Sequence, residues 1–231
     1  MIHYDKERVK AFYESILAEY DRDNIIDTIL RINESDAPEE MFTYQVGITP
    51  LIDEDLFTNR GWALYTKDFL LAGRFIANGE RDLLVNTLLS NKQLPRESIK
   101  LSELTPKRLR SSLGTNKYTI LFPVGKELNV FSKDWMRYVS YTDGKKKPRM
   151  QFLSYYDMVP VPDTIIGNRI VLLDTRKVYW EQKLFTKGLT RETSRLDIQL
   201  REHENGKVRV WIRSVHKMLL FPDAAKIIDL I

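Results

Sequence analysis

The chain has 231 residues, of which 43% are hydrophobic and 29% charged, which suits one folded domain or two interleaved ones and excludes a disordered chain. It contains no cysteine, which excludes disulfides, a thiol nucleophile and a thiolate metal site. The formal charge of +4 would help to hold nucleic acid, but it equally fits an ordinary basic surface. Because the sequence shows neither a signal peptide nor an apolar run long enough to span a membrane, we expect a protein of the cytoplasm or of a particle assembled there.

Near the N-terminus, apolar residues recur at three- and four-residue spacing while charged residues fill the other face, which predicts an amphipathic helix. Further apolar residues between 25 and 30 extend the pattern, so one long helix and two helices joined near 21–23 both fit. The helix packs either on its own core or on a neighbouring subunit. The stripe consists of Val9, Phe12, Tyr13, Ile16, Leu17 and Tyr20.

An acidic loop over residues 33–40 separates this helix from a stretch of alternating apolar and polar residues. The alternation predicts a strand with one apolar face that ends at Pro50. Such a strand pairs within its own domain or adds to the sheet of a neighbouring molecule. Its apolar residues are our candidates for contacts between subunits: Phe42, Tyr44, Val46 and Ile48.

A broad apolar stripe from Trp62 to Ile76 predicts a long helix, and we expect a separate short helix over residues 83–89. Within the long helix, small residues would let another element approach closely. They are Ala72, Gly73 and Ala77.

Residues 105–138 are predicted to form helix, strand and helix. Thr105 is a good N-cap and Pro106 is tolerated at the first helical position, while Gly114 is a favoured C-terminal cap. The apolar run 118–122 then predicts a buried strand that ends at Pro123. Spaced apolar residues from 124 to 138 predict a further helix.

The second half of the chain is predicted to be mostly β-structure. Asn205-Gly206 predicts a tight turn within a long hairpin. Without any internal repeat, the order of elements indicates the α+β class. The predicted strands are 150–153, 169–173, 178–185, 196–201 and 207–221.

Few residues suggest catalysis. The three histidines, His3, His203 and His216, are scattered, and no pair has the spacing of metal ligands on one element. The sequence contains neither a phosphate-binding glycine-rich loop nor a nucleophile elbow. We therefore expect no catalytic residue, no bound metal and no cofactor.

One short pattern is that of a divalent-cation nuclease. Pro162-Asp163 followed by Glu181-Gln182-Lys183 matches the Pro-Asp…Glu-x-Lys pattern of a large nuclease superfamily. In this interpretation Asp163 and Glu181, on adjacent strands, hold the cation and Lys183 polarises the attacking water. In the alternative, Asp163 begins a turn, and Glu181 and Lys183 face solvent from one strand.

A basic run follows the turn at Asp143-Gly144. Lys145, Lys146, Lys147 and Arg149 are candidates for contacts with nucleic acid phosphates. The alternative is a solvated loop tip, which is favoured by the lack of interleaved aromatic residues for base stacking.

The order of elements from Thr105 to Tyr179 resembles the axial domain of the Hong Kong ninety-seven type capsid proteins. In that family a short helix precedes an apolar strand ending in proline, and a helix with aromatic residues follows. The family then has a Val-Pro-Val step, a strand with a terminal Asp and a Tyr-containing strand. The corresponding stretches are 105–113, 118–123, 128–138, 158–163, 170–174 and 178–180.

The rest of the chain is similar to the same family. The long hairpin 207–221 is followed by a Pro-x-Ala step at 222–224, as in capsid chains. The helix over 63–77, followed by Glu80-Arg81-Asp82, resembles the spine helix of the peripheral domain, and Arg60-Gly61 resembles encapsulins. The extended-loop region and the whole chain are short for this family.

The resemblance implies a phage major capsid protein-like α+β fold with an axial domain, a peripheral domain with a long spine helix and β-hairpin, and a short extended loop. The implied division follows the chain. It is an N-terminal helical arm (1–40), the extended loop (41–52), the spine helix (53–100), the axial domain (101–195), the peripheral hairpin (196–221) and a C-terminal strand returning to the axial domain (222–231).

The resemblance implies a structural function without catalysis, small-molecule substrate or membrane partner. Many copies would self-assemble into an icosahedral virus or phage (or provirus) capsid that encloses DNA, in a virion assembled in the host cytoplasm. The alternative within the family is an encapsulin nanocompartment, which encloses a cargo protein through a short peptide docked on its inner wall. The alternative outside it is the nuclease described above.

Overall fold

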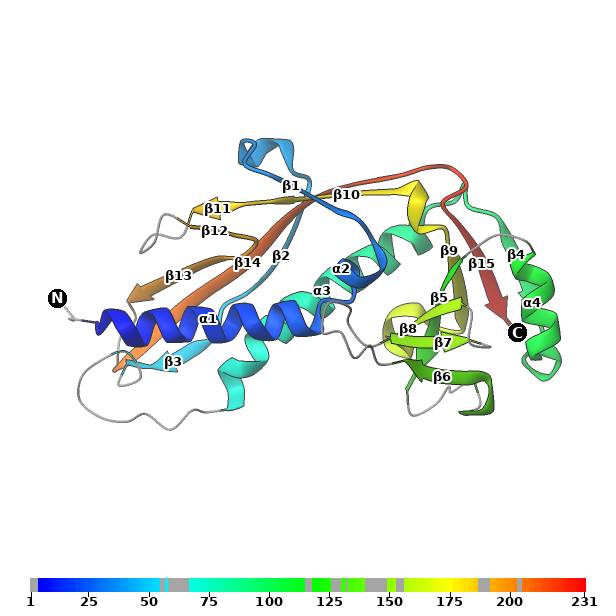
Figure 1. The fold of residues 1–231 in the computed structure, drawn as a ribbon, viewed down its shortest axis with the longest axis horizontal. Helices are drawn as coiled ribbons and strands as arrows, with labels where there is room; N and C mark the ends of the chain where they lie inside the picture. Colours follow the sequence, from blue (N-terminus) through cyan, green and yellow to red (C-terminus); the bar gives the residue numbers. More distant parts are fainter. Residues whose placement is uncertain are drawn as a thin grey trace. The chain divides into compact units, whose positions relative to one another are not determined.

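The computed structural model describes residues 4–54, 57, 67–114, 118–125, 130–131, 133–139, 149–152, 156–186, 192–202 and 205–231. The chain divides into two compact units, each with its own apolar core. Unit 1 consists of Met1–Ile26, Ile32–Glu80 and Trp180–Met218, and unit 2 of Asp27–Arg31, Arg81–Tyr179 and Leu219–Ile231. Figure 1 traces the elements named below.

The N-terminal segment forms two helices, α1 (Lys6–Asp23) and the short α2 (Ile26–Ile29). Asp5 caps α1, because its side chain accepts hydrogen bonds from the backbone N–H groups of Glu7 and Arg8, at 2.9 and 3.3 Å. The apolar stripe is the buried face of α1, as predicted, and its residues pack in the core of unit 1.

The prediction of a long helix followed by a short one is wrong, because α3 is continuous over Lys67–Ser90. The expected break at residues 80–82 does not occur because its charges are accommodated within the helix. Glu80 is buried among hydrogen-bond partners, while Arg81 pairs with its neighbour Asp82 at 2.8 Å. Buried residues continue on both sides of this point, among them Ile76 and Leu84.

The small residues of α3 do allow a close approach, as predicted. α1 crosses α3 at Gly73, where a Cβ atom would lie 2.5 Å from the backbone nitrogen of Tyr20 and would also meet the carbonyl oxygen of Ile16. Only glycine fits there without moving a backbone. The sequence therefore fixes where α1 packs in unit 1.

The long strand β14 organises the sheet of unit 1. The strand order is β1-β10-β14-β13, and two further strands, β2 and β3, also pair with β14. The predicted hairpin is confirmed between β13 and β14, with Asn205 and Gly206 in the left-handed conformation (φ 68° and 70°). The strands are β1 (Ile32–Ser35), β2 (Tyr44–Ile48), β3 (Leu51–Asp53), β10 (Val178–Lys183), β13 (Asp197–Glu202) and β14 (Lys207–Leu220), with a separate pair β11 (Phe185–Thr186) and β12 (Thr193–Ser194).

Unit 2 is built on a seven-stranded sheet with the order β4-β15-β9-β5-β8-β7-β6. Helix α4 (Pro106–Leu113) begins at its Thr105 cap and ends at Gly114 (φ 58°), as predicted. The strands are β4 (Arg96–Ile99), β5 (Thr119–Val124), β6 (Met136–Val139), β7 (Arg149–Phe152), β8 (Tyr156–Pro162), β9 (Arg169–Leu173) and β15 (Ala225–Leu230). The short helical elements are α5 (Asp163–Ile166), η1 (Glu39–Met41, in unit 1), η3 (Leu101–Glu103), η4 (Lys133–Trp135) and η5 (Thr175–Lys177).

Two predictions for unit 2 need correction. The described part of 124–138 holds the short η4 and strand β6 instead of a long helix, because Phe131 and Trp135 pack ring edge to ring face at 5.8 Å in this geometry. These two aromatic residues are four positions apart, which is also the spacing of residues on one face of a helix. Strand β5 also continues beyond Pro123 to Val124. The proline, which lacks an N–H, is tolerated because the pairing of β9 with β5 stops at Leu121.

Candidate functional site

The strand that carries the predicted subunit contacts is paired within its own unit. β2 runs antiparallel to β14, with Tyr44 opposite His216 and Val46 opposite Ser214. Val46 and Ile48 pack against the core of unit 1, while Phe42 lies near the ammonium of Lys183, which is 5.8 Å from its ring centroid. Phe42, Tyr44, Val46 and Ile48 are half buried, so only part of each side chain is open to a neighbour.

The structure does not bring the nuclease pattern together. Asp163 begins α5 in unit 2, whereas Glu181 and Lys183 lie on β10 in unit 1. The two strands that would have to be adjacent, β9 and β10, belong to different sheets. Lys183 instead donates to the carbonyl oxygen of Ala37 at 2.7 Å. The described residues contain no group of three His, Cys, Asp or Glu placed to hold a metal ion.

Most of the basic run lies outside the described residues. Lys145, Lys146 and Lys147 lie outside the described residues, and Arg149 is described by its backbone alone, as the first residue of β7. Its assignment to nucleic acid therefore stays a prediction. Among the described residues, no helix is long and apolar enough to cross a membrane.

An apolar strip is exposed where β10 begins and β14 ends, in residues that belong to unit 2. It consists of Tyr179, Leu219 and Phe221, which are 38%, 56% and 58% exposed. They lie together because β10 and β14 are neighbouring strands and the backbone N–H of Phe221 donates to the carbonyl oxygen of Lys177 at 3.1 Å. Contiguous apolar residues on a surface usually mark an interaction site, whereas isolated ones do not.

Unit 1 contains a buried polar cluster around Glu80, which is fully buried. The Tyr20 hydroxyl lies 3.0 Å from both carboxylate oxygens and can donate to one of them, and Asn24 Nδ2 donates to Oε2 at 3.0 Å. His216 Nε2 lies 3.1 Å from Oε1, and Gln182 Nε2 donates to the Tyr20 oxygen at 2.8 Å. We call these five residues the Glu80 cluster.

The Glu80 cluster joins four segments of unit 1. Tyr20 and Asn24 come from α1 and its C-cap, Glu80 from α3, Gln182 from β10 and His216 from β14. Burial raises the pKa of Tyr20 well above its ordinary value, and the nearby charge of Glu80 raises it further, so the hydroxyl keeps its proton. The cluster therefore fixes the packing of these segments. Sequence reasoning missed it, because its members lie far apart in the sequence and the histidines looked scattered.

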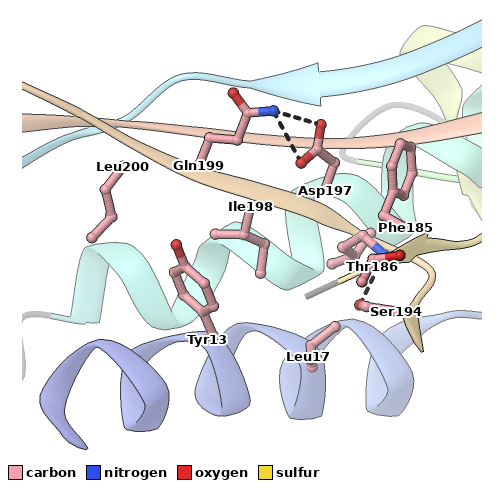
Figure 2. A pocket seen from close by; sticks show the side chains of 10 residues that line it. Tyr13, Leu17, Phe185, Thr186, Ser194, Asp197, Ile198, Gln199 and Leu200 are labelled. Carbon is pink, nitrogen blue, oxygen red and sulfur yellow. Dashed lines mark hydrogen bonds between the residues drawn. The ribbon is translucent and has the colours of Figure 1, made fainter. Parts of the chain in front are cut away.

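A pocket of about 460 Å³ lies beside α1, entirely within unit 1 (Figure 2). Tyr13 and Leu17 point into it from α1 and face Ile198 and Leu200 of β13. Asp197, at the pocket wall, accepts hydrogen bonds from Gln199 Nε2 at 3.1 and 2.9 Å. Burial raises the pKa of Tyr13, and the charge of Asp197 adds to this effect. The lining mixes apolar side chains with polar groups, and a concave site of this volume can hold a small ligand or a peptide.

The sequence matches no protein-family model and no curated protein. Solved structures do resemble it. Over 95% of this chain and 98% of the other, the fold is similar to a virus-like particle from Pyrococcus furiosus, with a TM-score of 0.58 and 10% identity.

Two further structures have TM-scores of 0.52. One is the holo-SrpI encapsulin complex from Synechococcus elongatus PCC 7942, 14% identical over 80% of this chain and 73% of the other. The other is the capsid of the cyanophage P-SCSP1u, 8% identical over 90% of this chain and 88% of the other. Such low identities establish a shared fold and leave function to be argued from the surfaces described above.

Proposed function

Because its fold is that of the Hong Kong ninety-seven type shell proteins, we propose that this chain is a structural subunit whose copies self-assemble into a closed shell. The observation that carries the proposal is the similarity over 95% of this chain and 98% of the virus-like particle chain. A function of this kind lies in surfaces and geometry, and it requires no catalytic residue, metal or cofactor.

Within that fold, we assign unit 2 as the axial domain and unit 1 as the peripheral domain. The long helix α3 is then the spine helix, and the β13–β14 pair is the peripheral hairpin. The segment containing β2 corresponds to a short extended loop. Phe42, Tyr44, Val46 and Ile48 remain our proposed contacts between subunits on that segment, through the part of each side chain that stays exposed.

The exposed apolar strip supports assembly independently of the comparisons. Leu219 and Phe221 are more than half exposed, and they stand beside a third apolar residue, Tyr179. Burying such side chains against a neighbour contributes about 25 cal/mol for each Å² removed from water. A shell subunit makes several modest contacts of this kind, and their combination closes the particle.

Icosahedral capsids and protein nanocompartments share this fold, and we favour a capsid that encloses DNA, in a virion assembled in the host cytoplasm. The net charge of +4 supports it, because basic groups bind phosphates and release their counterions. Lys145, Lys146, Lys147 and Arg149 are the proposed phosphate contacts, since they form the densest basic run of the chain.

The test is the size of the purified protein, measured by gel filtration and negative-stain electron microscopy. Closed shells of many subunits are expected, and a ratio of ultraviolet absorbance typical of nucleic acid would identify a capsid. A small, monodisperse oligomer at every protein concentration would contradict the proposal. Leu219→Ser combined with Phe221→Ser should reduce the yield of shells and leave the thermal unfolding of the monomer unchanged, because both residues are exposed.

A second candidate is an encapsulin-like compartment for a cargo protein, and the pocket beside α1 favours it. The pocket, of about 460 Å³, has the volume of a ligand site, and its lining combines Leu17, Ile198 and Leu200 with polar groups. In this case purified shells would contain a second protein instead of nucleic acid. Ile198→Asp should remove that protein from the shells, whereas the strip variant should act on assembly.

A further inference from the structure

The two units carry opposite formal charges. Unit 1 has 16 lysine and arginine residues against 20 aspartate and glutamate residues, a charge of −4. Unit 2 has 20 against 12, a charge of +8, and the two values add to the +4 of the whole chain. The mild charge of the chain therefore conceals a strong segregation between its parts.

In unit 2, two carboxylates are each shared between two cations. Glu97 binds both Arg108 and Lys226, each at 2.5 Å. Asp229 lies 3.1 Å from Arg169 and 3.8 Å from Arg96. Because each of these two carboxylates already pairs with two cations, neither is free to pair with a further basic residue.

In unit 1, two guanidinium groups are each divided between two carboxylates. Arg195 lies 3.0 Å from Asp21 and 3.8 Å from Glu34. Arg213 binds Asp197 at 2.9 Å and also pairs with Glu39. Here the acidic residues are in excess and the cations are the groups in short supply.

Each unit also exposes a pair of like charges on one of its surface elements. In α4, Lys107 and Arg110 are exposed, and they lie three residues apart on one side of the helix, away from the buried Leu109. In the connection between β1 and β2, Asp36 and Glu40 are exposed around η1. Within the described parts of the chain, none of these four side chains has an ion-pair or hydrogen-bond partner.

We propose that the basic face of α4 in one copy docks on the acidic β1–β2 connection of the next copy. The inference rests on the proposed shell function and names one of its contacts. Lys107 and Arg110 supply the positive side, and Asp36 and Glu40 the negative side. Because the two faces are different surfaces, the contact is head-to-tail, and each copy keeps its other face free for a further copy, as a ring or shell requires.

A second copy of the chain offers partners for the charges of both faces, whereas nucleic acid offers partners for the basic face alone. A phosphate backbone would neutralise Lys107 and Arg110, but it would leave Asp36 and Glu40 unpaired and would repel them. Complementary charges of this kind speed encounter and fix which surfaces meet, while they add less to the affinity than apolar burial does. The contact therefore sets the register of subunits, and the apolar strip supplies affinity.

The experiment is a charge exchange in the full chain. One variant carries Lys107→Glu and Arg110→Glu, another carries Asp36→Lys and Glu40→Lys, and a third carries all four substitutions. Each double variant should reduce the rate of shell formation about tenfold or more at low salt. The fourfold variant should recover the wild-type rate, because every copy then carries the same contact with its signs exchanged.

Salt and a matched control separate this contact from a general effect of charge. High salt should slow wild-type assembly, because it screens exposed charges, and should narrow the gap between the wild type and the double variants. The control is Lys6→Glu with Lys10→Glu, which changes the net charge as much as the α4 variant does but on exposed positions of α1. It should assemble faster than the α4 variant.

Three results would overturn the proposal. The double variants could assemble at the wild-type rate, or the fourfold variant could stay as slow as either double variant although it is folded. The α4 variant could also form normal shells that have lost their nucleic acid, which would assign the basic face to packaging. In all three cases wild-type shells form, so the shell function stands. A wild-type chain that never assembles would overturn the function and the contact together.

Discussion

The cores of the two units are held by different interactions. Unit 2 is closed by aromatic rings, with Phe122 and Phe152 both packed edge to face against Phe131, at centroid distances of 5.0 and 5.7 Å. Unit 1 adds a fully buried carboxylate to its apolar core, and that carboxylate requires specific donors. Apolar packing tolerates many arrangements of similar volume, while a buried charge tolerates only the one that satisfies it. Unit 1 is therefore the less adaptable of the two.

The contrast between the two cores would be wrong if the protein tolerated Glu80→Ala. The substitution removes the carboxylate that accepts hydrogen bonds from Tyr20 and Asn24 and pairs with His216, and it should cost about 3–5 kcal/mol of unfolding free energy. Urea unfolding of the variant measures this cost. A loss below about 1 kcal/mol would mean that the cluster does not hold unit 1 together.

A second test of unit 1 is Gly73→Ala, which places a methyl group against the backbone of α1. We expect a net cost of about 1–3 kcal/mol, because neither helix can move without disturbing the core. Gly79→Ala is the matched control in the same helix. Its new methyl group would meet only the Val46 side chain, at 2.5 Å, and that side chain can turn away. Equal costs for the two variants would contradict this account of the crossing.

A slightly smaller side chain in the apolar core of unit 2 should cost less unfolding free energy than the loss of Glu80 costs in unit 1. Ile170 is fully buried in β9, and Ile170→Val removes one methylene group, which should cost about 0.5–1.5 kcal/mol. Thermal unfolding of the variant measures the effect. A loss as large as that of Glu80→Ala would remove the distinction between a packed core and a hydrogen-bonded one.

The smallest effect should be the pH dependence contributed by Glu97 of unit 2. The hydrogen bond from Lys226 lowers its pKa below the ordinary value of 4.5, although burial opposes the shift. A lowered pKa stabilises the folded state above the unfolded pKa, and this stability is lost as the pH falls through the folded pKa. In Glu97→Gln, unfolding free energy should therefore fall less steeply below about pH 5, by less than about 1 kcal/mol. An unchanged slope would show that the ion pair contributes nothing.

Sequence patterns predicted the elements that local residues determine. The stripe of α1, the Thr105 and Gly114 caps of α4 and the Asn205-Gly206 turn each depend on residues within a few positions of one another. The family resemblance came from the order of such elements, and the fold comparisons agree with it.

What the sequence did not reveal depends on contacts between distant segments. The Glu80 cluster joins Tyr20 to Gln182, which are 162 positions apart, so no local pattern indicates it. The continuous α3 has a related cause, because the burial of Glu80 depends on partners from α1 and β14 that no local pattern indicates. Which charges of α4 and of the β1–β2 connection lack a partner among the described residues likewise depends on the folded structure and not on a local pattern.

The position of β15 has a consequence for how the protein is made. This strand lies between β4, to which it is parallel, and β9, to which it is antiparallel. During synthesis β4 and β9 therefore emerge long before the strand that joins them, and the seven-stranded sheet cannot close until residues 225–230 have left the ribosome. A chain cut short by interrupted translation would therefore lack the strand that joins β4 to β9, and it could not complete the sheet of unit 2.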